Sequence, residues 1–145
     1  ENAMQDEWST DFGVGCKYFS QDAVIKLAPA AGIALDENLS PAEKLKVVQA
    51  LMEKADPGAQ AIFETIGAYL AYTVVLYSQF YDIEHMMMLG RVMSGKGGDT
   101  ILRVCNEILA DEYPALAKKC EVSLPDEKTR RVGQSVAAAS LPRIR

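Results

Sequence analysis

The chain has 145 residues, of which 49% are hydrophobic and 24% are charged, and its formal net charge at pH 7 is -5. This composition excludes a disordered chain and predicts a single soluble, cytoplasmic domain with a hydrophobic core. The acidic balance argues against direct nucleic-acid binding, which requires a concentrated basic face; the cluster Lys128, Arg130 and Arg131 is more typical of a solvated helix face.

The N-terminal residues and the cysteines bear on domain limits and compartment. Residues 1–4, Glu-Asn-Ala-Met, resemble a cloning remnant, which leaves residues 5–145 as one domain. The acidic residues that follow leave no apolar stretch for a signal peptide. Cys16, Cys105 and Cys120 are widely spaced, without a Cys-x-x-Cys pair, which favours reduced thiols packed as small apolar groups over a disulfide or zinc framework.

The first part of the chain predicts an irregular lead-in followed by two helices. Residues 5–19 are aromatic and punctuated by glycines, without a clear period. Ser20 is placed to cap a short helix over residues 21–28. The pattern Ser-Pro-Ala-Glu at residues 40–43 is a capping box with proline at the first helical position, and it predicts a helix over residues 41–55.

The next segment, residues 57–81, predicts a helix that is apolar nearly all round and therefore central in the fold. Its uncharged stretch, residues 65–78, is shorter than the ~20 residues that a membrane span needs, so no membrane contact is expected. Gly67 would let another element approach closely. The four tyrosines at helical spacing predict core and rim packing, with hydroxyls that reach water or a partner, rather than a stacking platform. They are Tyr69, Tyr72, Tyr77 and Tyr81.

The second half of the chain alternates strands and helices. Residues 82–89 predict a strand, residues 90–98 a glycine-rich turn, and Asp99 or Thr100 the cap of a helix that follows. His85, inside the strand, is expected to be a core or sheet-edge residue rather than a ligand or base. After these come a short helix ending near Lys119, a brief strand and a last helix. The last two cover residues 120–124 and 125–141. This order predicts an α/β fold that is rich in helix, with a small and partly parallel sheet.

The glycine turn is the candidate site. A strand that leads through glycines into a helix aims backbone N–H groups and the positive end of the helix dipole at one point, where an anion could bind. Gly90, Gly95 and Lys96 nearly match a P-loop, but Gly97 replaces the hydroxyl residue that would hold magnesium, so the match is treated as accidental. Nucleotide or anion contact and a plain tight turn are equally good interpretations of these residues.

Three segments resemble the ROK family of sugar kinases and transcriptional repressors, within the actin, Hsp70 and hexokinase superfamily. The first contains the pattern Ile-Gly-x-x-Leu-Ala, followed by an aspartate, a strand and the glycine turn; the second leads into a Ser-capped helix; the third is a closing small-residue helix. They are residues 61–99, residues 13–28 and residues 130–142. The resemblance implies the C-terminal lobe of a ribonuclease H-like, actin-like ATPase fold.

In that family the turn faces ATP, and the resemblance carries this function onto seven residues. They are Gly90, Arg91, Ser94, Gly95, Lys96, Gly97 and Gly98. It also implies ATP with Mg²⁺ as cofactor, a sugar as substrate or effector, an N-terminal lobe of the same protein as partner, and a homo-oligomer. Arg91 stands where the family usually has a second glycine.

Several family motifs are missing from this sequence. It has no phosphate loop of the type Asp-x-Gly-x-Thr, no Asn-Asp-x-Asn segment with the catalytic aspartate, and no cysteine-rich zinc loop, so no zinc is expected. A nucleotide-facing lobe of a sugar kinase or regulator, inactive alone, is therefore the first hypothesis. A non-catalytic binding or dimerisation module with a kinase-like fold is the alternative.

Overall fold

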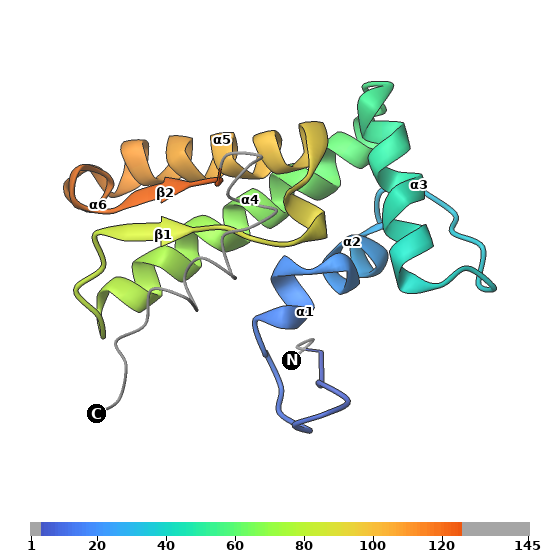
Figure 1. Ribbon diagram of the computed structural model, residues 1–145, viewed down its shortest axis with the longest axis horizontal. Helices are drawn as coiled ribbons and strands as arrows, with labels where there is room; N and C mark the ends of the chain where they lie inside the picture. Colours follow the sequence, from blue (N-terminus) through green and yellow to red (C-terminus); the bar gives the residue numbers. More distant parts are fainter. Residues whose placement is uncertain (1–3, 126–145) are drawn as a thin grey trace, which may run out of the picture.

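A computed structural model describes residues 4–125 and contains seven helical segments of α or 3-10 type and two strands in that range (Figure 1). They are α1 (Cys16–Phe19), α2 (Gln21–Leu27), α3 (Pro41–Glu53), α4 (Pro57–Ser78), β1 (His85–Met87), the 3-10 helix η1 (Arg91–Met93), α5 (Gly95–Glu112), α6 (Pro114–Lys119) and β2 (Glu121–Ser123). The helix predicted over residues 125–141, the basic cluster and the third family-like segment lie outside the described residues.

The two strands form a small parallel sheet, as predicted. His85 pairs with Glu121, Met86 with Val122, and Met87 with Ser123. Strands that run in parallel need a crossover connection, and α5 with α6 supplies it. Met86 and Val122 face the helices, whereas His85 and Met87 are exposed on the outer face. Within residues 4–125 the chain is therefore a helix-rich α/β fold with a two-stranded sheet.

The core lies between α4 and α5, which are side by side and run in the same direction, while β1 and β2 run back along them (Figure 1). The prediction that α4 is central is confirmed, because eight of its residues are buried. The largest fully buried side chains of the pair are Ile62, Phe63, Ile66, Ile101 and Leu109. α4 is also long and apolar enough to cross a membrane by length and composition alone, and 44% of its most apolar stretch is buried inside the protein.

The close approach of α4 and α5 depends on Gly67, as the sequence predicted. A methyl group at this position would lie 2.9 Å from the carbonyl oxygen of Ile101 and 2.9 Å from Cβ of Val104. Contacts that short do not occur between packed carbons, so the two helices would have to separate. The missing side chain of one residue thus sets the distance between the two main helices.

The predicted helix starts are confirmed by their caps. The Ser40 and Glu43 side chains form a reciprocal capping box at α3, with Pro41 in the first turn. The Asp56 carboxylate accepts a hydrogen bond from the Ala59 N–H at α4, at 2.9 Å. These caps satisfy backbone donors that packing alone would leave without partners.

Three element boundaries were predicted wrongly. β1 spans three residues instead of residues 82–89, because its only partner in the described chain, β2, is itself three residues long. α4 ends at Ser78 and not at Tyr81, because the chain turns away from the helix axis after Ser78. α5 begins at Gly95, and Asp99 lies inside it, because tertiary packing favours a helix through glycines of low intrinsic propensity.

We expect Gly67→Ala to destabilise the protein by about 1–3 kcal/mol, because the added methyl group overpacks the contact between α4 and α5. Urea denaturation followed by circular dichroism measures this free energy of unfolding. Gln60→Ala, on the exposed face of the same helix, is the matched control and should change it by less than about 0.5 kcal/mol. Equal stability of Gly67→Ala and the wild type would contradict the packing argument.

Candidate functional site

The predicted glycine turn forms one continuous structure, η1 followed by the first turn of α5. Gly90 has a φ angle of 122°, a conformation that side chains other than glycine rarely adopt, and this brings the chain from β1 into η1. Arg91 is exposed, and its carbonyl oxygen accepts a hydrogen bond from Nε2 of Gln49 at 2.9 Å. Ser94 occupies the position before α5, but its side chain makes no capping hydrogen bond.

A carboxylate of the chain itself lies at the N-terminus of α5. Glu53, the last residue of α3, accepts a hydrogen bond through Oε1 from the backbone N–H of Lys96, at 3.3 Å. The Lys96 ammonium in turn donates to the Glu53 carbonyl oxygen at 3.0 Å and lies 3.4 Å from Oε2. Glu53 therefore provides the negative charge that the N-terminus of a helix attracts.

The last two glycines of the turn are explained by packing. Gly97 and Gly98 are both buried, whereas an anion cradle presents its backbone to solvent. A methyl group on Gly97 would lie 2.6 Å from the Phe63 ring, and one on Gly98 would lie 2.1 Å from the Met93 carbonyl oxygen. Contacts within the protein thus account for two of the four glycines that suggested a ligand.

The seven predicted site residues are therefore brought together, but not as an open anion site. Gly90, Arg91 and Ser94 are exposed, Gly95 and Lys96 adjoin Glu53, and the other two support the core. The turn does not fit a nucleotide phosphate as it stands, because a bound phosphate would meet the Glu53 carboxylate. Nothing in the sequence pointed to Glu53, since 43 residues separate it from Lys96.

A second candidate site lies on the other side of α4. A hollow of about 390 Å³ is formed between residues 13–19 and one stripe of α4. The α4 side chains that line it are spaced as one helical face, and they are Tyr69, Tyr72, Thr73, Leu76 and Tyr77. Tyr18 from α1 completes the aromatic lining, with its ring 5.7 Å from the Tyr69 ring in an edge-to-face arrangement. We call this the tyrosine hollow.

Exposed apolar side chains continue from the tyrosine hollow past the end of α4 at Ser78. The exposed fractions are 48% for Tyr72, 50% for Leu76, 42% for Tyr77, 72% for Phe80 and 67% for Tyr81. Together these five side chains form what we call the α4 aromatic surface. The core part of the predicted core and rim packing is wrong, because none of the four tyrosines is buried; Tyr69 is half-buried and the other three are exposed.

The prediction that a tyrosine hydroxyl reaches a partner is confirmed at Tyr72. Its hydroxyl donates to the Glu112 carboxylate, with oxygen distances of 2.9 and 3.2 Å. This hydrogen bond raises the pKa of Tyr72 above its ordinary value, because the carboxylate stabilises the protonated phenol. The contact joins the C-terminal part of α4 to the end of α5.

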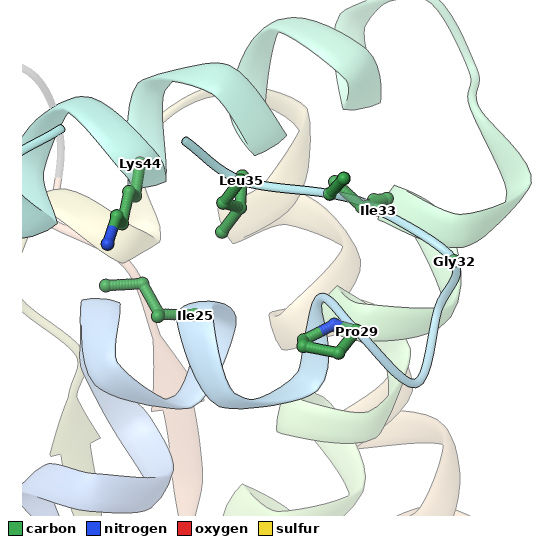
Figure 2. Close-up of a pocket in the computed structure, with 7 residues that line it drawn as sticks. Ile25, Pro29, Gly32, Ile33, Leu35 and Lys44 are labelled. Carbon is green, nitrogen blue, oxygen red and sulfur yellow. The ribbon is translucent and has the colours of Figure 1, made fainter. Parts of the chain in front are cut away.

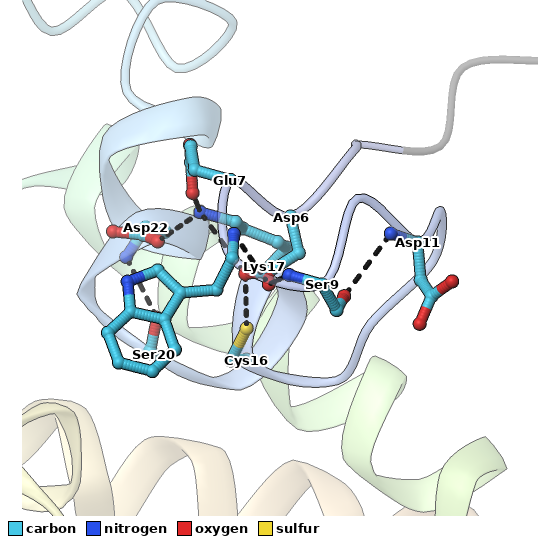
Figure 3. A network of polar contacts seen from close by, with 9 residues as sticks. Asp6, Glu7, Ser9, Asp11, Cys16, Lys17, Ser20 and Asp22 are labelled. Carbon is cyan, nitrogen blue, oxygen red and sulfur yellow. Dashed lines mark hydrogen bonds and ion pairs between the residues drawn. The ribbon is translucent and has the colours of Figure 1, made fainter.

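An ion-pair cluster holds the N-terminal segment against α2 (Figure 3). The Lys17 side chain is only 5% exposed, and its ammonium donates to Glu7 and, at 2.9 Å, to Asp22. The hydrogen bond from Lys17 lowers the pKa of Glu7, while hydrogen bonds from Ser9 lower that of Asp6. Sequence reasoning missed this cluster, because residues 5–19 gave no periodic signal.

A further hollow, between α2 and α3, is mainly apolar (Figure 2). Its volume is about 520 Å³, and its lining includes Ile25, Pro29, Ile33 and Leu35, with Lys44 at one side. The Lys44 ammonium lies 3.4 Å from the Glu37 carbonyl oxygen, which it can reach as a donor. Because its one cation already contacts the backbone, this hollow offers little to orient a ligand.

The titratable side chains of the described chain give weak support for catalysis. Burial raises the pKa of the Cys105 thiol to about 12 and also raises that of Cys120, so these thiols are packed as predicted. Cys16 is exposed, contrary to that prediction, and its pKa is raised as well. Among residues 4–125 no three His, Cys, Asp or Glu side chains are grouped to hold a metal ion.

His85 is an exposed residue of the sheet, which agrees with the predicted sheet-edge position and not with the predicted core position. Its Nδ1 lies 3.4 Å from Oε2 of Glu121 on the paired strand, and both side chains are largely exposed. A polar contact between two such exposed side chains contributes little to stability.

Comparison with known proteins identifies no family for this chain. No protein-family model matches it, and neither a curated protein nor a solved structure matches it. The family resemblance read from the sequence therefore stays a prediction, and function is argued from the two candidate sites.

The Lys17 cluster predicts a specific dependence of stability on pH. The pKa of Glu7 is lower in the folded protein than its ordinary value. The ionised Glu7 carboxylate therefore contributes its full stabilisation at pH values above the ordinary pKa, and this stabilisation is lost as the pH falls through the pKa of the folded protein. We expect Lys17→Met to remove this contribution. The difference in free energy of unfolding between wild type and variant should be constant near neutral pH and shrink between about pH 5 and pH 3.

Urea denaturation across this pH range measures that difference, with exposed Lys54→Met as the matched control. If the difference for Lys17→Met did not depend on pH, the cluster would have no electrostatic part in folding.

Proposed function

We propose that this chain is a non-catalytic binding module that presents the α4 aromatic surface to a polypeptide partner. The observation that carries the proposal is the run of exposed apolar side chains from Tyr72 to Tyr81, along the end of the core helix and the turn that follows it. A soluble domain exposes single apolar side chains freely, whereas a contiguous group of large ones is typical of an interaction site. Aromatic residues are also enriched at protein interfaces.

The position of this surface supports the same function. Tyr72, Leu76 and Tyr77 belong to a helix whose opposite face is buried in the core, so they are held in place without a partner. A rigid surface loses little conformational entropy when it binds, which leaves more of the burial energy for affinity. Support for catalysis is weaker, since the cysteine pKa values are raised and the single histidine is exposed.

Selection of phage-displayed random peptides tests this function. We expect the peptides that wild type enriches to bind Leu76→Ser/Phe80→Ser at least about tenfold more weakly, because each apolar side chain buried at an interface contributes about 1.5–3 kcal/mol. Val47→Ser, an exposed apolar position on α3, is the matched control and should bind these peptides as wild type does. Circular dichroism verifies that each variant is folded.

Two other results are informative. Peptides that bind the double variant as tightly as wild type would refute the proposed surface. Sedimentation velocity shows whether wild type self-associates, and a dimer that Leu76→Ser/Phe80→Ser abolishes would identify a second copy of the chain as the polypeptide partner.

A second function, which we propose as the alternative, is that of a nucleotide-facing lobe of a ROK-like sugar kinase or regulator. Its supports are the sequence resemblance and the N-terminus of α5, an 18-residue helix whose first-turn N–H groups lack a cap from Ser94. The ribonuclease H-like lobe, ATP with Mg²⁺, a sugar and an N-terminal lobe as partner belong to this proposal. This second function requires the Glu53 carboxylate to move away from the N-terminus of α5.

Titration with ATP and Mg²⁺, followed by the backbone amide signals of residues 95–99, tests this second function. Because Glu53 would repel the phosphate, we expect Glu53→Gln to respond at a lower ATP concentration than wild type, and the chain alone to phosphorylate no sugar. Glu37→Gln, in the loop before α3, is the matched control. Unchanged amide signals in Glu53→Gln at millimolar ATP would refute nucleotide contact at this turn.

A further inference from the structure

We infer that the tyrosine hollow receives an arginine side chain of the polypeptide partner. This inference rests on the proposed function, and it adds the chemical class of side chain that the surface selects. Three features favour this occupant: the lining of the hollow, a cation already seated on one of its rings, and the Glu112 carboxylate beside it.

The lining of the hollow suits a cation that stacks on aromatic rings. Four phenol rings and Phe19 surround it, and none of its nine lining residues is charged. Each ring presents a negative face, and a guanidinium is planar and weakly hydrated, so it gives up less solvation in such a place than a lysine ammonium does. The volume of the hollow, about 390 Å³, is at the low end for a ligand site and is suited to one long side chain.

One of these rings already contacts a cation. The Lys26 ammonium lies over the Tyr18 ring, 5.0 Å from its centroid, although Lys26 is not part of the lining. The rings of Tyr72 and Tyr77 also open to solvent, and they stay about half exposed, with no cation of the described residues seated on them. They are the surfaces left for an incoming guanidinium.

A carboxylate beside the hollow complements the positive charge. The Tyr72 hydroxyl donates to both oxygens of Glu112, at 2.9 and 3.2 Å. An ionised carboxylate has about four acceptor sites, so Glu112 can accept further N–H donors next to the phenol. The fork of a guanidinium fits such a pair of oxygens better than a point charge does. The chain as a whole carries a net charge of -5, which favours a cationic partner.

The hollow and the rest of the α4 aromatic surface are continuous. Leu76 and Tyr77 belong to both, and Phe80 follows in the turn after the end of α4 at Ser78. One partner segment can therefore place arginine in the hollow and an apolar side chain against Phe80. The inference predicts that peptides selected on wild type carry arginine next to apolar residues.

Nuclear magnetic resonance tests this inference with N-acetyl-arginine amide as the probe and N-acetyl-citrulline amide, its uncharged isostere, as the control. We expect arginine amide to shift the ring signals of Tyr69, Tyr72 and Tyr77, with an affinity about fivefold higher than that of citrulline amide. Tyr77→Leu should weaken the arginine amide response, and Tyr77→Phe, which retains a ring, should preserve it. Glu112→Gln should reduce the preference for arginine over citrulline.

The outcomes separate this inference from the proposed function. Phe80→Ser should abolish capture of the selected peptides while leaving the arginine amide response unchanged, because Phe80 lies outside the hollow. Equal responses to the two amides, or shifts of equal size at Tyr81, which lies outside the hollow, would overturn the arginine site. Peptides that depend on Leu76 and Phe80 but lack arginine would overturn the arginine site and leave the binding module in place.

Discussion

The structure depends on one close contact, the approach of α4 to α5 at Gly67. The absence of a side chain there lets the Ile101 carbonyl and Val104 pack directly against the α4 backbone. One turn earlier in α4, the Phe63 ring packs directly against Gly97 of α5, which likewise has no side chain. Once these helices are joined, β1 and β2 have a surface to lie on, since a two-stranded sheet is marginal without such support.

The same contact decides how the glycine turn is used. Gly97 and Gly98 are drawn into the core, and the carboxylate of Glu53 reaches the N-terminus of α5 from the end of α3. Two of the glycines and one of the N–H groups that suggested anion binding are thus used within the chain. The opposite side of α4 is different, because only Tyr72 among its tyrosines bonds to Glu112, and aromatic rings and apolar side chains stay exposed there. That asymmetry favours a binding surface over a nucleotide site.

The sequence by itself determined the local elements. Caps at Ser40 and Asp56, the apolar period of α4 and the small residue at Gly67 act over a few residues, so they could be read directly, and the parallel sheet followed from the order of elements. It also placed the seven residues of the glycine turn in one connection. It could not distinguish a glycine needed for a ligand from one needed for packing, because both are the same residue in the same local pattern.

Tertiary structure decided the rest. Glu53 meets Lys96, Tyr72 meets Glu112, and Gly97 meets Phe63 across 43, 40 and 34 residues of sequence, and no local period carries such pairings. The tyrosines of α4 share a stripe that the sequence shows, but whether that stripe faces the core depends on which side α5 covers. The physical reason is that hydrophobic burial is not directional, so side-chain chemistry alone does not choose among the faces of an apolar helix.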